Sequence, residues 1–188
     1  MTIFDRLNAQ RPWMEEERLV LDQVMRIAED VIAPAAVGYD KSGDYPETSM
    51  AALNKLGMNT IFVPDAYGGA LMSYRLYLEC VSIISAACAS TGIIYATNFH
   101  GMKPLIDLGT EEQKTRLLPR ISGGGLGSLA ITEPSAGSDA TGMKTRFTPD
   151  GDEIIIDGSK TFISNGDRAE LILLFGKWSE IEDSRQAI

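Results

Sequence analysis

The hydrophobic pattern of this 188-residue chain changes its period near residue 122, and this change limits the possible folds more than any other feature. Before that point apolar residues recur at the spacings of amphipathic helices, and after it they alternate every second residue, as in strands. Helices therefore come first and strands second, without the strand–helix alternation that builds a parallel sheet. We predict an α+β fold in which an all-helical bundle over residues 1–124 precedes an antiparallel β-domain over residues 125–188.

Turn and capping residues divide the first part of the chain into helices. The first helix is expected to stop before Pro34, since proline interrupts helical hydrogen bonding. Gly101 and Pro104 predict a kink or a break in a later helix. The expected helices cover residues 13–31, 47–56, 74–89, 92–108 and 111–121, and the last begins with a capping box formed by Thr110 and Gln113.

The second part of the chain is expected to contain strands at residues 129–132, 144–147, 153–156, 160–164 and 171–175, with hairpin turns at Asp150-Gly151 and Asp157-Gly158. The glycine-rich run SGGGLG at residues 122–127 follows a helix and precedes a strand. Phosphate-binding loops of Rossmann and P-loop proteins have the opposite order. We therefore interpret the glycines as a hinge between two domains.

Charge, hydropathy and cysteine content argue against several classes of protein. The net charge is −9 and no basic run occurs, so neither nucleic acid nor an anionic membrane is an expected partner. No apolar run is long enough to span a membrane and the N-terminus has no signal core, so we expect a cytoplasmic protein. Cys80 and Cys88 are eight residues apart on one expected helix, too far for a disulfide. The single histidine gives no basis for a metal site.

Two segments of the expected β-domain can bind a flat ring with polar edges. One is the strand ending at Thr132 with the following Gly-Ser-Asp corner at residues 137–139, and the other is Phe-Ile-Ser-Asn at residues 162–165. Backbone N–H groups and hydroxyls on neighbouring strand ends can hold such a ring and its phosphates. On spacing alone, an ordinary β-meander with serine-rich turns explains the same residues.

The same two segments resemble the flavin-binding β-domain of the acyl-CoA dehydrogenase family. The family pattern is T-E-P-x-A-G-S-D followed by G-x-K-x-[WF]-I-[ST]-N, and this chain has TEPSAGSD at residues 132–139 and GSKTFISN at residues 158–165. The helical part agrees through VPDAYGG at residues 63–69 and LGTEEQK at residues 108–114. The resemblance covers nearly the whole chain and implies the N-terminal helical domain with the first part of the β-domain, an incomplete β-barrel.

The resemblance implies FAD as the cofactor. Ile131 and Thr132 match positions that meet the pyrimidine side of the isoalloxazine ring through backbone groups and the threonine hydroxyl. Phe162 and Ser164 match positions along the other ring edge, where many members have Trp and Thr, and Ser164 would lie near flavin N5 and O4. The complete set implied for the cofactor is Leu129, Ala130, Ile131, Thr132, Gly137, Ser138, Phe162, Ile163 and Ser164.

The resemblance also implies an acyl-CoA substrate. Ser138 matches a position that contacts the CoA part, and a helical stretch with Ile93, Ala96, Thr97 and His100 matches the lining of the acyl pocket. For His100, a polar residue satisfied within the helical bundle is the alternative. Glu133, a carboxylate within the first motif, matches a structural position and not that of a general base.

The implied reaction is α,β-dehydrogenation of an acyl-CoA thioester to the trans-2-enoyl-CoA, as in fatty acid metabolism. In the family a glutamate removes the α-proton while the β-hydrogen leaves as hydride to flavin N5. Hydrogen bonds to the thioester carbonyl stabilise the enolate-like charge of the transition state. The reduced flavin then passes its electrons to electron-transfer flavoprotein or a similar acceptor.

Family members continue into a C-terminal four-helix bundle that supplies the catalytic glutamate and the core of a homotetramer. This sequence ends within the β-domain, so we expect no catalytic residue in it and no activity from this chain alone. It is expected to be a fragment or to be completed by a second polypeptide, and to form a homo-oligomer, a tetramer or dimer, when complete. Two other functions remain open: a related flavoenzyme, such as an acyl-CoA oxidase or a flavin monooxygenase, and a non-catalytic subunit that keeps the fold.

Overall fold

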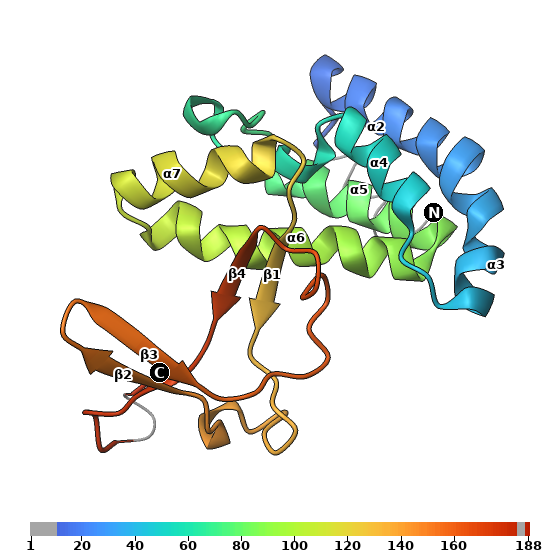
Figure 1. Ribbon diagram of the computed structural model, residues 1–188. Helices are drawn as coiled ribbons and strands as arrows, with labels where there is room; N and C mark the ends of the chain where they lie inside the picture. The colour runs from blue at the N-terminus through green and yellow to red at the C-terminus, as the bar shows by residue number, and fades with distance from the viewer. Residues whose placement is uncertain (1–10, 184–186) are drawn as a thin grey trace. The chain divides into compact units, whose positions relative to one another are not determined.

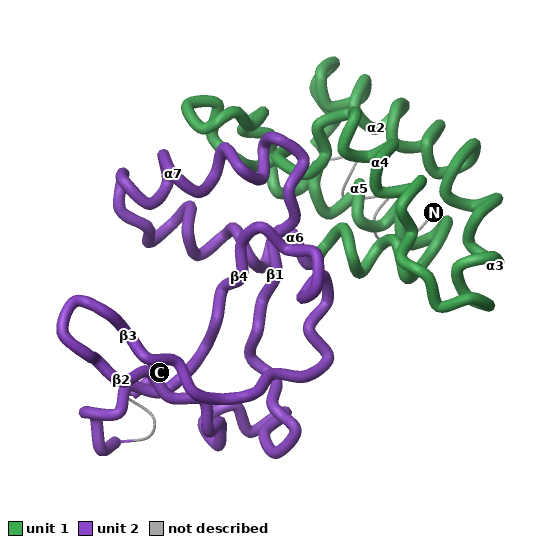
Figure 2. The backbone as a smooth tube through the Cα atoms, in the orientation of Figure 1, with its two compact units in different colours: residues 1–96 green, residues 97–188 purple. Residues whose placement is uncertain are grey.

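The computed structural model describes residues 11–183 and 187–188. The helices of the described chain lie mainly between residues 15 and 122 and the strands begin at residue 127, so the predicted order of the α+β fold is confirmed (Figure 1). The chain separates into two compact units, one ending at Ala96 and the other beginning at Thr97 (Figure 2). This division falls inside helix α6 (Ala89–Leu108), before the change of hydrophobic period at residue 122.

The first unit is built from helices around an apolar core. Its helices are α2 (Glu15–Ile27), the π-helical turn η1 (Ala28–Ile32), α3 (Ala33–Ser42), α4 (Glu47–Lys55), α5 (Tyr74–Ala87) and the beginning of α6, with short 3-10 turns η2 (Met58–Thr60) and η3 (Asp65–Tyr67). Amphipathic faces of α2, α4 and α5 meet, and the side chains that they bury completely include Val24, Ile32, Leu53, Leu76 and Ile84. Gly57 follows α4 in the left-handed conformation, as expected of a residue just past a helix end.

The prediction that the first helix stops before Pro34 is wrong. The π-helical turn η1 joins α2 directly to α3, and Pro34 lies in the first turn of α3. In this turn the N–H of Ala33 bonds to the carbonyl of Ala28, five residues back. Because a proline in the first turn of a helix needs no N–H partner, the helical path continues past Pro34. Helix α3 ends at Ser42, and its C-cap Gly43 has a φ of 72°.

Helix α6 runs without a break from Ala89 to Leu108, so the break considered at Gly101 and Pro104 does not occur. Gly101 has a packing role instead. A Cβ atom at this position would lie 2.5 Å from the backbone nitrogen of Ser128, which is closer than van der Waals contact allows. The glycine therefore lets strand β1 (Gly127–Ala130) approach the helix backbone directly.

In its described residues, 97–183 and 187–188, the second unit contains the end of α6, helix α7 (Glu111–Ser122) and five short strands. The capping box predicted for α7 is confirmed, because the Thr110 hydroxyl accepts the Gln113 N–H and the Gln113 side chain accepts the Thr110 N–H. Strand β1 pairs with β4 (Leu171–Leu174), and β2 (Arg146–Asp150) lies between β3 (Glu153–Asp157) and β5 (Lys177–Trp178). A 3-10 turn, η4 (Ala140–Gly142), precedes β2.

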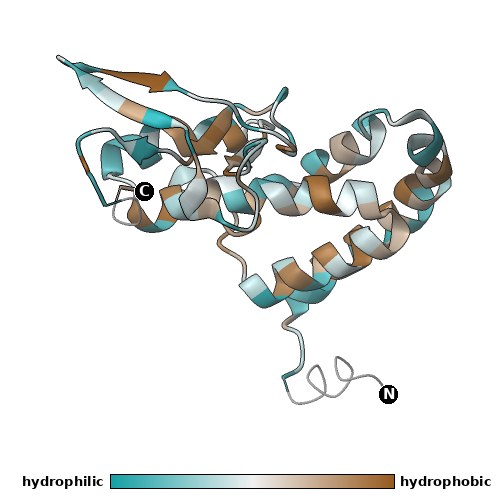
Figure 3. Cartoon of the chain, turned by 90° about the horizontal axis from the view of Figure 1, so that it is seen from below, coloured by the Kyte–Doolittle hydropathy of each residue, from teal (hydrophilic) through white to brown (hydrophobic). Residues whose placement is uncertain are grey.

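The predicted antiparallel pairing is present in the β2–β3 hairpin, which turns at Gly151 and Asp152, one residue later than the predicted turn at Asp150-Gly151. The other two pairs, β1 with β4 and β2 with β5, are parallel. Three consecutive isoleucines, Ile154, Ile155 and Ile156, are each about half exposed on β3, and Figure 3 shows this strand in brown. None of the helices in the described part of the chain has the length and apolar character needed to cross a membrane.

Residues 160–164 do not form the predicted strand. They follow an irregular course in which Phe162 has a φ of 56°, and Asn165 just beyond has a φ of 63°. Both values lie in the left-handed region, which strand residues do not adopt.

Candidate functional site

The structure brings two of the predicted site segments together. We call residues 127–133 the strand segment and residues 160–165 the loop segment. Among the hydrogen bonds that join them are those from the Thr161 N–H to the Thr132 carbonyl (2.9 Å), from the Ser128 hydroxyl to the Ser164 carbonyl (2.7 Å), and from the Asn165 side-chain amide to the Gly127 carbonyl (3.3 Å). These bonds fix the two motifs beside each other although about 30 residues separate them in the chain.

Helix α6 anchors the start of the strand segment. The side-chain oxygen of Asn98, which is buried, accepts the N–H of Gly127 at 2.8 Å. A Cβ atom at Gly127 would lie 2.9 Å from the Asn98 carbonyl oxygen, so this approach requires glycine. The last glycine of the sequence run thus serves close packing of a strand on a helix.

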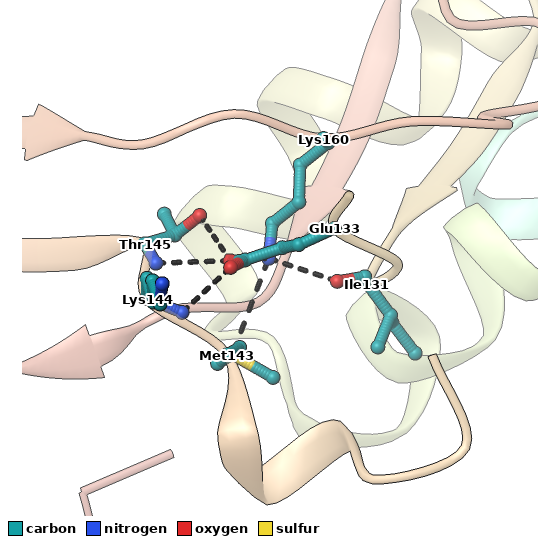
Figure 4. A network of polar contacts seen from close by, with 6 residues as sticks. All are labelled: Ile131, Glu133, Met143, Lys144, Thr145 and Lys160. Atoms are coloured by element: carbon teal, nitrogen blue, oxygen red, sulfur yellow. Dashed lines mark hydrogen bonds and ion pairs between the residues drawn. The ribbon is translucent and has the colours of Figure 1, made fainter. Parts of the chain in front are cut away.

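A buried polar network surrounds Glu133 at the end of the strand segment (Figure 4). The side chain of Glu133 is 5% exposed. One carboxylate oxygen accepts the Thr145 N–H (2.9 Å), the Thr145 hydroxyl (2.5 Å) and the Lys160 ammonium (2.8 Å), and the other accepts the Lys144 N–H (2.6 Å). Charge-assisted hydrogen bonds of this kind are the strong ones in proteins.

These contacts determine the protonation state of Glu133. Burial on its own raises the pKa of the carboxyl group, but the hydrogen bonds from Lys160, Thr145 and Lys144 outweigh it and lower the pKa to about 2. The side chain is therefore ionised at neutral pH, and its acceptor sites are occupied by protein donors. A carboxylate in this state is a poor general base, which agrees with the structural position that the motif implies for it.

Phe162 has an unusual conformation for an apolar residue. Its side chain is 92% exposed, and its backbone is in the left-handed region. Both properties cost free energy, since a large apolar ring prefers burial and a non-glycine residue avoids positive φ. Strain of this kind gathers at ligand sites, so Phe162 indicates that the loop segment is shaped to present its ring to another molecule.

Two of the hydroxyl groups predicted to bind the cofactor belong to the two joined segments, one to each. Thr132 and Ser164 are both half-buried, and their backbone carbonyls are occupied by the bonds between the segments. Neither side-chain hydroxyl makes a hydrogen bond with another residue in the described part of the chain. The segments thus offer an aromatic ring and two unused hydroxyls in a framework fixed by backbone bonds.

The remaining predicted cofactor residues are placed differently. Ala130 is buried, and Leu129, Ile131 and Ile163 are half-buried; all four lie in the two joined segments. Gly137 and Ser138 lie in an exposed turn. Two backbone hydrogen bonds between Glu133 and Ala136 (3.0 and 3.1 Å) close the chain just before this turn. Within the described residues, no hydrogen bond joins Gly137 or Ser138 to the loop segment.

The predicted substrate residues share one face of α6. Ile93, Ala96, Thr97 and His100 follow the helical spacing of three, four and seven residues. Ile93 and His100 are exposed, Ala96 is half-buried and Thr97 is buried. The ring centroids of His100 and Phe99 are 6.0 Å apart, and the exposure of His100 does not fit the alternative of a histidine satisfied inside the bundle.

Sequence reasoning missed two features of this unit. Lys160 belongs to the second motif, but nothing in the sequence indicates that its ammonium reaches both the Ile131 carbonyl (2.9 Å) and Glu133. A cavity of about 330 Å³ lies between the end of α6, α7 and β4, lined mainly by leucines. None of the predicted site residues lines this cavity.

Residues 11–183 and 187–188 contain no cluster of His, Cys, Asp and Glu that could hold a metal ion.

Two models of one protein family match the chain. The acyl-CoA dehydrogenase N-terminal domain matches residues 14–125, and the acyl-CoA dehydrogenase middle domain matches residues 128–187. The chain belongs to the acyl-CoA dehydrogenase family. This confirms the resemblance inferred from the two sequence motifs, since both lie in the part that matches the middle domain.

The curated relatives that this chain matches are about twice as long. It is 37% identical over 176 residues to the probable acyl-CoA dehydrogenase YngJ of Bacillus subtilis, covering 93% of this chain and 46% of the relative. It is 39% identical over 163 residues to the cyclohex-1-ene-1-carbonyl-CoA dehydrogenase of Geobacter metallireducens, covering 86% and 43%. The chain thus spans less than half the length of each of these relatives.

Solved structures of the family have the same fold. Butyryl-CoA dehydrogenase from Megasphaera elsdenii has a TM-score of 0.82 at 27% identity, covering 88% of this chain and 45% of that one. A glutaryl-CoA dehydrogenase from Mycobacterium smegmatis in complex with FADH2 has a TM-score of 0.82 at 25% identity, covering 92% and 45%. A structure described as an electron transferring flavoprotein of Acidaminococcus fermentans has a TM-score of 0.85 at 31% identity, covering 94% and 46%.

Proposed function

We propose that this chain forms the N-terminal part of an FAD-dependent acyl-CoA dehydrogenase, which converts an acyl-CoA thioester to the trans-2-enoyl-CoA. Family membership supports the reaction class, and two relatives over 25% identical carry the names of acyl-CoA dehydrogenases with defined substrates. The observation that carries the proposal is the exposed, strained Phe162, because its loop segment is bonded directly to Thr132 of the strand segment.

The residues present fit a flavin. A flavin ring has two large apolar faces and a polar edge that carries hydrogen-bond donors and acceptors, so its site needs aromatic contact and a few placed polar groups. Phe162 offers the aromatic contact, and the hydroxyls of Thr132 and Ser164 are unused by other described residues. The FADH2 complex of the glutaryl-CoA dehydrogenase, which has the same fold, supports FAD as the ligand.

Each residue has a separate task in this proposal. Thr132 and Ile131 bind the pyrimidine side of the ring, Ser164 binds the opposite polar edge, and Phe162 covers the ring. Bound FAD would accept the hydride that leaves the β-carbon of the substrate. Ser138 binds the CoA part of the substrate, and the exposed residues of α6, Ile93 and His100, contact the acyl chain.

We propose no catalytic base in this chain. The carboxylate within the site, Glu133, is ionised, buried and fully bonded to Lys160, Thr145 and Lys144. The base, the acceptor, which would be electron-transfer flavoprotein or a similar protein, and the tetrameric or dimeric assembly belong to the complete protein. We place the domain boundary at residues 124 and 125, supported by the change of matching family domain between residues 125 and 128.

Anaerobic absorbance spectroscopy of the complete protein tests the proposal. We expect a flavin absorption band after purification with FAD, and loss of this band when one class of acyl-CoA is added from a panel of short, long, branched and cyclic acyl groups. A flavin band that no acyl-CoA bleaches would favour a related flavoenzyme of the family, such as a monooxygenase. Bleaching followed by rapid recolouring in air would favour an oxidase. No flavin at all would favour a non-catalytic subunit.

A further inference from the structure

The contacts of Lys160 suggest a role beyond charge compensation. Its side chain is 10% exposed, and its ammonium donates to the Ile131 carbonyl (2.9 Å) and to Glu133 (2.8 Å), with the Met143 sulfur at 4.0 Å. An ammonium group has three donors, so the two strong bonds and the weak sulfur contact account for all of them. Lys160 is therefore fully used within the protein and is not available to a ligand (Figure 4).

These bonds hold the two residues that precede and follow Thr132 in the sequence. Lys160 holds the residue before it, Ile131, by its carbonyl, and the residue after it, Glu133, by its carboxylate. The neighbour of Lys160, Thr161, donates its N–H to the carbonyl of Thr132 itself at 2.9 Å. Three consecutive residues of the strand segment are thus bonded to two consecutive residues of the loop segment.

The same connection reaches the other half of the site. Phe162, with its strained backbone and exposed ring, follows Thr161 directly, and Ser164 is bonded through its carbonyl to Ser128. Any change in the position of Lys160 relative to Ile131 would alter the spacing between the Thr132 hydroxyl and the loop residues. A ring bound by both segments would lose contacts if this spacing changed, since a binding site must hold its groups to within about 0.5 Å.

We propose that Lys160 is a positioning residue, which sets the spacing of the two flavin-binding segments by bonding at once to the Ile131 carbonyl and to Glu133. This inference rests on the proposed function, because it assumes that the two segments bind one ring. It differs from a purely structural role, in which Lys160 only compensates the buried charge of Glu133. A structural role predicts that FAD affinity follows stability in every variant of the network.

Four substitutions separate these roles in the complete protein. Lys160→Met removes both bonds, and Lys160→Arg keeps the charge next to Glu133 with a planar group that cannot occupy the same position. Thr145→Val removes a hydroxyl that donates to Glu133 but, among the described residues, bonds neither to Ile131 nor to the loop segment. Lys144→Met is the matched control for loss of a lysine, because the Lys144 side chain is exposed and its backbone bond to Glu133 is retained.

The measurement is the dissociation constant for FAD, taken with the visible circular dichroism of the bound flavin at saturation and the unfolding midpoint. We expect Lys160→Met and Lys160→Arg to weaken FAD binding by about 10- to 100-fold and about 10-fold, the scale of one or two lost polar contacts, and to change the dichroism. We expect Thr145→Val to lower the unfolding midpoint with FAD affinity within about twofold of wild type, and Lys144→Met to change neither. If Lys160→Met does not fold, Lys160→Arg decides.

Any other result would contradict either the positioning role of Lys160 or the proposed function. Wild-type FAD affinity and dichroism in the folded Lys160 variants would overturn the positioning role and leave the proposed function intact. Equal loss of FAD affinity in Thr145→Val would also overturn it, since the effect would then follow stability. A wild-type protein that binds no FAD would overturn the proposed function, and this inference with it.

Discussion

Each unit of the molecule contains one buried glutamate, and the comparison shows how the same residue can serve different purposes. Glu17 in the first unit is 4% exposed and Glu133 in the second is 5% exposed. In both, burial raises the pKa, but hydrogen bonds outweigh it, so that the pKa is lowered. The two carboxylates differ in the donors that they accept.

Glu17 accepts from neutral groups at the starts of two helices. Its oxygens bond to the Met14 N–H at 3.1 Å, which begins α2, and to the Ser73 hydroxyl at 2.7 Å. Ser73 in turn caps α5 by accepting the Leu76 N–H at 3.3 Å. Glu133 accepts instead from an ammonium that also holds the candidate site. The first arrangement joins two helix ends, and the second joins the chain segments that would bind a ligand.

The largest expected effect on stability is that of Lys160→Met. It leaves the buried carboxylate of Glu133 without its cation, and breaking a buried ion pair on one side costs about 3–5 kcal/mol. Urea unfolding of the apoprotein measures this loss. The control, Lys144→Met, removes an exposed lysine and should change the free energy of unfolding by less than about 0.5 kcal/mol. A similar small loss for Lys160→Met would mean that Glu133 is compensated by its other donors.

The loss of stability in acid should also distinguish the two glutamates. The pKa of Glu133 falls from 4.5 to about 2 on folding, so between these values the unfolded chain binds a proton that the folded chain does not. The stability that this gives is fully present above about pH 5 and is lost as the pH falls toward 2. Unfolding at pH 6 and pH 3 should show less pH dependence in Glu133→Gln than in wild type.

Glu17→Gln is the matched variant for this experiment. The pKa of Glu17 is also lowered, so its removal reduces the pH dependence in the same direction. We expect the smaller reduction from Glu17→Gln, because it has no hydrogen-bonded cation. An equal or larger reduction would show that neutral donors, together with the nearby charges of Arg75 and Arg11, stabilise this buried carboxylate as well as a hydrogen-bonded ammonium does.

How far the sequence predicts these features depends on the range of the interaction. Local chemistry identified the α7 capping box at Thr110 and Gln113 and the turn at Gly57. The π-helical turn before Pro34 was missed, because tertiary packing decides whether a chain passes a proline. Parallel pairing of β1 with β4 was missed for the same reason, since the partners are about 40 residues apart.

The candidate site shows the same division. The two motifs identified the segments, and the structure joins them as hydrogen-bonded neighbours. The left-handed conformation of Phe162 could not be predicted, because phenylalanine favours extended backbone and only the surrounding bonds can hold it otherwise. The reach of Lys160 to Ile131 depends on side-chain geometry that no spacing in the sequence specifies.

A double substitution tests the ligand side of the comparison. Thr132→Val with Ser164→Ala removes two hydroxyls that other described residues do not use, so stability should change little. FAD binding should weaken, since each lost polar contact costs about 0.5–1.5 kcal/mol. Thr148→Val with Ser159→Ala is the matched control, because it removes two exposed hydroxyls of the same unit outside the site. Unchanged FAD affinity in the first variant would remove both hydroxyls from the proposed site.

The smallest expected effect on the whole molecule is that of Glu17→Ala. Loss of the bond to the Met14 N–H and of the bond from Ser73 should cost about 1–2 kcal/mol, measured by thermal or urea unfolding. Glu16→Ala, which removes the exposed glutamate next to it in the first turn of α2, is the control and should cost less. FAD affinity should be unchanged in both, because Glu17 holds helix ends and no segment of the proposed site. A loss of FAD affinity in Glu17→Ala equal to that of Lys160→Met would mean that cofactor binding follows stability alone, and the two glutamates would then serve one purpose.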